Sequence, residues 1–433
     1  MGRRKKITGS LWLFAGVIFA LIMVLGVLFV TCTVGEEKNK DVGLPKVELL
    51  LNDTTLEEIY LSGRDEKYEG NEIFLKDGDN SVFLTGVQIK GRGNTSWDEP
   101  KKPFRIKFAN RVDLLGLGFA RKWVLLANNL DDTLMRNDIA FYVNRLLDGD
   151  YAMDGRFVVL YVDGKELGVY YLMKSISDNR GVVRLHDPMG VLVELDNLHG
   201  DGELVYETEG GNCLTLKNVA SDDVATEALN EFGEAFEEIE YYASIKDYES
   251  LKKVADLESF AEYFLITEYT NNPDGFSTSW WFYKDGAGDV IHAGPAWDFD
   301  FALGNTRWGD VVTSDFHDPA KPLTNREGAE DAKEQSVEVA KIIYHMLEIP
   351  EFRAMVEKIY RERLMGKSKE VVLRIKENTK LLREVAISDA KKWEKWDFDT
   401  EVERLIWWVE KRFRMMDEEY GGRTPIPVSE EEI

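Results

Sequence analysis

The segment GPAWDFDFALGN, residues 294–305, places two carboxylates, Asp298 and Asp300, in a run of apolar and aromatic side chains. The aromatic neighbours indicate burial, yet a buried carboxylate without a partner is strongly disfavoured or takes up a proton. Both acids can stay charged only where a positive group shares their environment. Any fold of this chain must therefore bring a cation, either a side chain or a metal ion, to this segment.

The pattern of apolar residues changes once along the chain. Residues 44–220 contain short alternating runs separated by Gly, Asn and Asp, including a hairpin signal at Asp163-Gly164, and predict β-strands. Residues 221–418 have helical spacing, as in Leu257–Thr270, where the apolar side chains are predicted to share one face. We expect an α+β fold with a β-rich first part and a helical second part.

The N-terminus predicts a membrane anchor. Residues 11–34 contain no charged side chain, and this length crosses a hydrocarbon core of roughly 30 Å as a helix. The basic residues before it favour the cytoplasmic side, which leaves the body of the chain outside the cell membrane. An alternative is a lipoprotein signal with Cys32 acylated, although Thr31 is large for the position before a modified cysteine. The expected organisation is a cytoplasmic tail at 1–10, a signal anchor at 11–34, a linker at 35–43, one domain at 44–418 and a disordered tail at 419–433.

Composition excludes one class of partner. The formal net charge is −25, and nucleic-acid binding depends on neutralising phosphates with Lys and Arg, so we expect no nucleic-acid partner. With Cys32 in the anchor, Cys213 is left alone and the body has no internal disulfide. The five histidines show no spacing typical of a metal site.

A basic cluster stands out in this acidic chain. The stretch GRGNTSWDEPKKPFRIKF, residues 91–108, combines glycines with Arg92, Asn94, Lys102 and Lys107. Backbone amides next to glycine and nearby cations suit a polyphosphate. The alternative is a tight turn followed by an edge strand with exposed lysines.

Asp274 lies in a loop signal, NNPDG, after a predicted helix. Taken alone, this stretch is typical of a plain turn. A hairpin follows it, and then Asp298 and Asp300. A loop acid, a hairpin and a second acidic loop occur in the same order in a kinase core, where one acid meets the substrate hydroxyl and another holds magnesium. Magnesium prefers carboxylate oxygens together with water and phosphate, so it would answer the need for a cation.

Five separated motifs resemble the spore-coat protein H (CotH) kinase-like family. They are KGRGNTSW with PKKPFRIKF, KWVLLANNLDDTLMRN, VDGKELGVYYL, EYTNNPDG and GPAWDFDFALGN, and they follow the order of the family over residues 44–365. The resemblance implies an atypical, two-lobed protein-kinase-like fold and a surface-associated Ser/Thr protein kinase that uses ATP with Mg or Mn.

The resemblance also implies roles for individual residues. Asp274 matches the catalytic-loop acid, and the metal-binding loop contributes Asp298, Asp300 and Asn305. The nucleotide side consists of Arg92, Asn94, Lys102 and Lys107. The expected protein substrate is a surface or coat protein.

The chain departs from the family pattern after the VYYL strand. Many members have leucine-x-glutamate there, and this chain has Met173-Lys174-Ser175. An Asn also stands at 271, where Lys is common. These departures favour a second hypothesis, a surface binding or coat-assembly module that keeps the fold without chemistry. A third is a metal-dependent phosphohydrolase, which would use the same acids with water as the acceptor.

Overall fold

The structure is a computed structural model that describes residues 43–177, 181–196, 202–276, 278–305, 318–322 and 337–422, with the side chains of 337–340 left out. The predicted anchor at 11–34 and the tail beyond residue 422 lie outside the described residues. Within the described ranges, no helix is both long and apolar enough to cross a bilayer.

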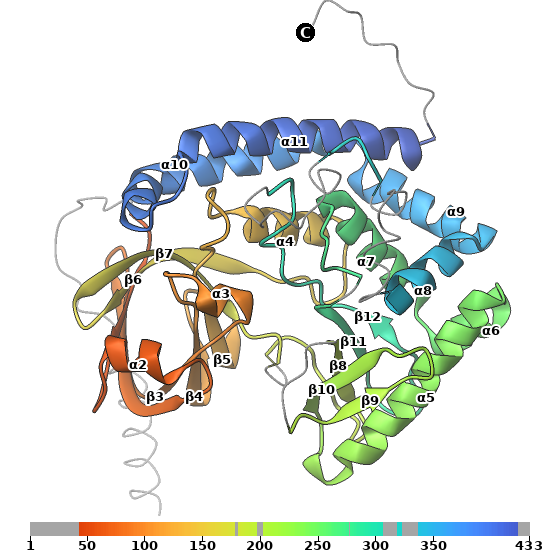
Figure 1. Ribbon diagram of the computed structural model, residues 1–433, viewed down its shortest axis with the longest axis horizontal. Coiled ribbons are helices and arrows are strands. Elements are labelled where there is room, and N and C mark those ends of the chain that lie inside the picture. Colours follow the sequence, from red (N-terminus) through yellow and green to blue (C-terminus); the bar gives the residue numbers. More distant parts are fainter. Residues whose placement is uncertain are drawn as a thin grey trace, which may run out of the picture. The chain divides into compact units, whose positions relative to one another are not determined.

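The first part of the chain closes into a β-barrel with strand order β1-β2-β3-β4-β5-β7-β6 (Figure 1). The barrel strands are β1 Lys46–Leu50, β2 Lys67–Asp77, β3 Asn80–Gly91, β4 Phe104–Asp113, β5 Phe119–Leu126, β6 Gly155–Val162 and β7 Lys165–Lys174. Neighbouring strands are antiparallel except β1 and β6, which close the barrel in parallel. The β6–β7 hairpin turns at Asp163 and Gly164, both with positive φ, as the sequence predicts.

Alternate residues of the barrel strands point inward and form its core. Ile89, Phe104, Ile106 and Trp123 are buried there. The intervening residues of β4, Arg105 and Lys107, point outward. Two short helices, α2 Leu56–Ser62 and α3 Thr95–Asp98, connect barrel strands.

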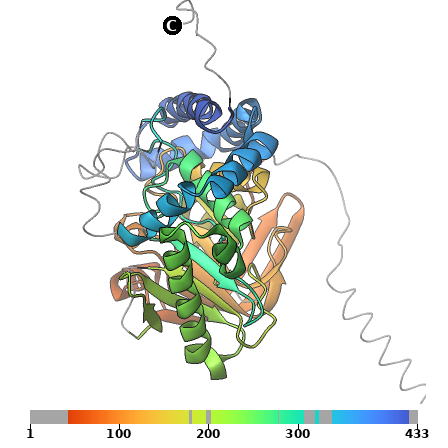
Figure 2. The same ribbon diagram turned by 90° about the vertical axis from the view of Figure 1, so that its right-hand side faces the viewer.

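A second, antiparallel sheet has strand order β12-β11-β8-β10-β9. Its strands are β8 Val191–Leu195, β9 Val205–Glu207, β10 Cys213–Val219, β11 Trp280–Lys284 and β12 His292–Ala293. Strands from either side of residue 220 therefore share one sheet, and the long helix α5 (Ala225–Ser244) packs on it (Figure 2).

Helices form the remainder of the domain. They are α4 Arg136–Leu146, α6 Tyr248–Val254, α7 Leu257–Thr270, α8 Val337–Leu347, α9 Pro350–Ile359, α10 Ser368–Lys392 and α11 Phe398–Glu419, with a π-helical turn at Tyr360–Leu364. The paired helices α10 and α11 run side by side along one end of the domain, and α10 contacts both β7 and α4 (Figure 1). The prediction of a mixed α+β fold, β-rich first and helical second, is confirmed.

Helix α7 differs from the prediction of one apolar face. It begins after the N-cap Asp256, and all its residues except Glu258 are buried. The reason is tertiary, because α4, α9, α11 and β12 contact it on different sides. This central position fixes the loop that follows α7, which carries Asp274.

Candidate active site

The loop after β12 brings the two acids of the opening segment against the end of α7. Asp298 has a left-handed backbone, with φ of 61°. Its carbonyl accepts a hydrogen bond of 2.9 Å from the Asn272 side chain, and the Leu303 amide donates to the Thr270 carbonyl at 2.7 Å. The acidic loop and the loop that carries Asp274 are therefore joined by direct hydrogen bonds.

Asparagine side chains hold the second acid in place. The Asn137 side chain of α4 donates to the Asp300 carboxylate, and its oxygen accepts from the Phe299 amide at 3.0 Å. Asn305 donates to the carbonyl of Leu130 at 2.8 Å and to the carbonyl of Asp300. The amide nitrogen of Asn305, predicted as a metal-site residue, thus braces the loop.

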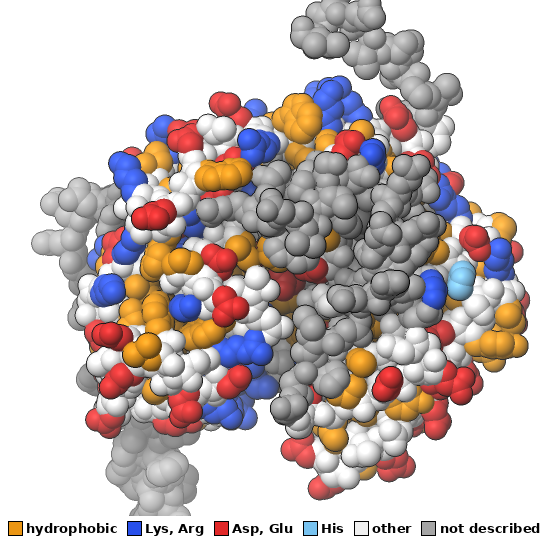
Figure 3. Space-filling view, in the orientation of Figure 1, with side chains coloured by type: hydrophobic (Ala, Val, Ile, Leu, Met, Phe, Trp, Pro, Cys, Tyr) orange, Lys and Arg blue, Asp and Glu red, His pale blue; other side chains and the backbone are white. Residues whose placement is uncertain are grey.

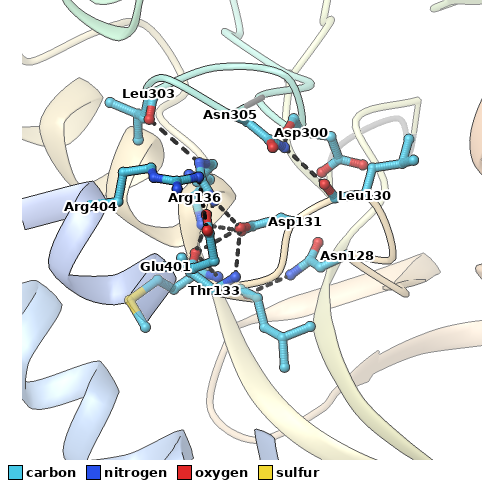
Figure 4. Close-up of polar contacts among 12 residues, drawn as sticks. Asn128, Leu130, Asp131, Thr133, Arg136, Asp300, Leu303, Asn305, Glu401 and Arg404 are labelled. Atoms are coloured by element: carbon cyan, nitrogen blue, oxygen red, sulfur yellow. Dashed lines mark hydrogen bonds and ion pairs between the residues drawn. The ribbon is translucent and has the colours of Figure 1, made fainter. Parts of the chain in front are cut away.

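A buried ion pair supports this corner from below (Figure 4). Asp131 and Arg136 are almost fully buried, and the Asp131 carboxylate also accepts hydrogen bonds from the Thr133 amide and hydroxyl at 2.9 and 2.7 Å. The Arg136 side chain reaches the Leu303 carbonyl at 3.5 Å. Asp131 and Arg136 thus form a structural pair, whereas Asn137 contacts the candidate site directly.

Asp274 follows a helix C-cap that needs a left-handed residue. Asn271 supplies it with φ of 52°, a conformation that Asn adopts more readily than Lys does. The Tyr263 hydroxyl then donates to the Gly275 carbonyl at 3.0 Å, and the Asp274 amide donates to the Asn272 side chain at 3.3 Å. Burial, with the nearby charge of Asp298, raises the pKa of Asp274 to about 7.

The three carboxylates crowd one another. Burial raises the pKa of Asp298, while the Arg92 guanidinium opposes the rise. Burial, followed by the charge of Asp298, also raises the pKa of Asp300. One guanidinium therefore faces two partly buried acids and leaves negative charge uncompensated. A divalent cation bound by Asp298 and Asp300 fits this set of oxygen donors.

Arg92 lies between the barrel and the acidic loop. Its guanidinium stacks on the Trp297 ring at 4.8 Å from the centroid. Figure 3 shows further Lys and Arg side chains gathered over β4 and β5, on the side of the barrel toward the second sheet. The cation that the opening segment requires is therefore present as a side chain.

The other predicted nucleotide-side residues are placed differently. Asn94 is exposed and accepts a hydrogen bond from Arg64. Lys102 donates to the Trp97 carbonyl, and its ammonium lies over the rings of Trp97 and Tyr60 at 5.3 and 5.9 Å. Lys107 is half-buried on the outer face of β4, opposite Gln88 and Lys122 in the neighbouring strands. Of these four predicted residues, only Arg92 interacts with the acids in the structure.

Sequence reasoning missed Glu194, and it did not select Arg105 from the basic stretch as a site residue. Glu194, in the central strand β8, is held by Lys217 at 3.2 Å. Burial first, and then the charges of Asp196 and Asp298, raise its pKa to about 7, although Lys217 opposes the rise. Its negative charge also acts on Arg92 and Arg105. The signal in the sequence was a single acid inside an otherwise apolar strand, VLVEL.

A separate cluster contains the one histidine that meets several acids among the described residues. Asp150, Asp256 and His292 offer ligand atoms within 4.8 Å of one another. His292 also stacks on Tyr283, with 4.6 Å between the ring centroids. None of these residues belongs to the predicted metal loop, and sequence spacing alone gave no indication of the cluster.

Comparison with known proteins identifies the class. The family model described as CotH kinase protein matches residues 89–416, which covers the barrel from the end of β3 onward, the second sheet and the helices through most of α11. The chain belongs to the CotH kinase family. A search of curated proteins gave no match. Family membership supports a kinase-like protein, and kinases in general use ATP with a divalent metal.

Proposed function

We propose that this chain is a membrane-anchored, extracytoplasmic CotH-type protein kinase with a two-lobed kinase-like fold. It transfers the γ-phosphate of ATP to Ser or Thr of surface or coat proteins, with Mg or Mn. The observation that carries the proposal is the convergence of Asp274, Asp298 and Asp300 with Arg92. Three partly buried acids at one place repel one another unless a cation joins them.

In this reaction the substrate hydroxyl oxygen attacks the γ-phosphorus. The bond from that phosphorus to the bridging oxygen breaks, and ADP leaves. Asp274 orients the hydroxyl and accepts its proton. Asp298 and Asp300 would hold the divalent cation, which would balance charge on the phosphates. Arg92, stacked on Trp297, supplies a fixed positive charge from the barrel side.

A surface binding or assembly module is the second candidate. The observation in its favour is that β7 ends in Met173 and Lys174 and is followed by the buried Ser175, so no carboxylate stands where many relatives have glutamate. Glu194 weakens the case for a module without chemistry. It supplies an acid from the neighbouring sheet, and its negative charge acts on Arg92.

Thermal unfolding of the full-length protein in detergent, with ATP and Mg or Mn, tests the proposal. A ligand at 100 times its Kd adds about 2.7 kcal/mol of stability. We expect a metal-dependent shift in the wild type and in the exposed control Asp79→Asn, and none in Asp298→Asn. Asp274→Asn should keep the shift and lose transfer of radiolabelled phosphate to protein.

Other outcomes assign the remaining functions. No shift with either metal would favour the binding module. Release of free phosphate without any labelled protein would favour the phosphohydrolase. A wild-type response in Asp298→Asn would show that the metal site lies elsewhere.

A further inference from the structure

Arg105 is an arginine without a described partner at the edge of the candidate site. It lies in the middle of β4 between Phe104 and Ile106, whose side chains fill the barrel, and therefore points outward. Its Nε is buried, and no described residue accepts a hydrogen bond from it. A buried donor left unpaired is strongly disfavoured, and a bound anion is one partner that would satisfy it.

The nearby positive charge of Arg92 further disfavours a charged Arg105 without an anionic partner. Arg92 lies close enough that, after burial, its charge is the main cause lowering the pKa of Arg105, to about 10. Asp65 and Glu194 offset part of that repulsion. Glu194 is already engaged by Lys217 at 3.2 Å, so its charge is shared. Arg105 therefore carries a positive charge beside Arg92 that Asp65 and Glu194 offset only in part.

The neighbouring lysines are committed to the protein. The Lys101 ammonium forms a fully buried ion pair with Asp389 at 2.8 Å. The Lys102 ammonium donates to the Trp97 carbonyl. Neither ammonium is available in this arrangement without breaking an existing contact, which distinguishes both lysines from Arg105.

We propose that Arg105 and Arg92 together bind phosphate oxygens of the nucleotide, with Arg105 as the principal hydrogen-bond donor on the barrel side. A guanidinium offers donors in a planar fork that matches phosphate, and two adjacent guanidinium groups require a multiply charged anion. A polyphosphate that contacts both arginines supplies the anionic partner that the Arg105 Nε lacks. The inference rests on the proposed function for the identity of the anion as a nucleotide.

Calorimetric titration of the full-length protein in detergent, with sodium tripolyphosphate and with ATP plus Mg, tests this assignment. We expect Arg105→Ala to weaken both ligands by about tenfold or more, the scale of one charge-assisted hydrogen bond. Arg105→Lys keeps the positive charge but lacks the planar guanidinium. Its affinity for each ligand should lie between those of the wild type and Arg105→Ala. The exposed β2 residue gives a matched control, Lys76→Ala, which should bind as the wild type does.

The melting temperature without ligand supplies a second readout. Removal of a charged side chain with an unpaired buried Nε should leave the melting temperature unchanged or raise it, whereas loss of a purely structural arginine would lower it. Wild-type affinity in Arg105→Ala, or a large drop in its ligand-free melting temperature, would overturn the assignment.

The two ligands separate this inference from the proposed function. Arg105-dependent binding of tripolyphosphate without any binding of ATP would keep the anion site and reject the kinase. Binding of ATP with equal affinity by the wild type and Arg105→Ala would keep the kinase proposal and reject the anion site at Arg105. Binding of neither ligand by the wild type would reject both.

Discussion

Arg412 of α11 and Glu268 of α7 form an ion pair of 2.9 Å in which both side chains are fully buried. The same guanidinium donates to the Tyr269 carbonyl at 3.1 Å and to the Lys321 carbonyl at 2.6 Å. The last long helix therefore holds the end of α7, immediately before the loop with Asp274. This contact gives the C-terminal helices a direct part in forming the candidate site.

The Arg412→Met variant should have a much lower free energy of unfolding than the wild type. It leaves the Glu268 carboxylate buried without its cation, which costs about 3–5 kcal/mol. Urea unfolding measures the change. The double variant Arg412→Met with Glu268→Gln removes the stranded charge and should recover part of the loss. Equal stability of Arg412→Met and the wild type would contradict this account.

Asn137→Ala should weaken metal binding more than it weakens the fold. The side chain holds both the Asp300 carboxylate and the Phe299 amide. Residues that orient metal ligands typically contribute about 10–100-fold to affinity. Electron paramagnetic resonance with Mn²⁺ gives the dissociation constant directly. The matched control is Asn144→Ala, a buried asparagine of the same helix. If both variants bind Mn²⁺ equally, Asn137 does not act through Asp300.

Local signals in the sequence predicted several elements of the structure. The Asp163-Gly164 turn and the α7 segment follow from local signals, and the structure brings Asp274, Asp298 and Asp300 together with Arg92. What the sequence could not predict depends on contacts across the fold. That Lys101 is committed to the protein depends on Asp389, 288 residues further along the chain. Asn137, Arg105 and Glu194 become relevant only once α4, the barrel and the second sheet meet.

Lys101→Met tests whether Lys101 has a structural role, in contrast to the phosphate-binding role proposed for Arg105 in the same basic stretch. Lys101 is fully buried against Asp389 and also donates to the Val169 carbonyl. Its loss should cost about 3–5 kcal/mol in chemical unfolding. Affinity for ATP, titrated well below the melting temperature, should remain that of the wild type. The partner change Asp389→Asn, added to Lys101→Met, should restore part of the stability, because an amide oxygen can still accept from the Val169 amide at 2.9 Å. A loss of affinity that exceeds the unfolded fraction would place Lys101 in the anion site instead.

His292 should make the stability of the domain depend on pH above neutrality. Burial alone would lower its pKa, but the neighbouring carboxylates of Asp150, Asp256 and Asp289 raise the pKa of His292 to about 10. The folded state therefore holds a proton that the unfolded state releases near pH 6.5. The stabilising contribution is complete below about pH 6.5 and is lost as pH rises toward 10.

Unfolding free energies at pH 6, 8 and 10, for the wild type beside His292→Gln, measure this contribution. The three carboxylates are each about a third exposed. We therefore expect a screened difference on the order of 2 kcal/mol in favour of the wild type at pH 6. It should shrink steadily and vanish above pH 10. Because other groups titrate equally in both proteins, only the difference between the curves is diagnostic. A difference that stays constant, or grows with pH, would mean that the imidazole is neutral in the folded protein and that the ion pairs with the aspartates do not form.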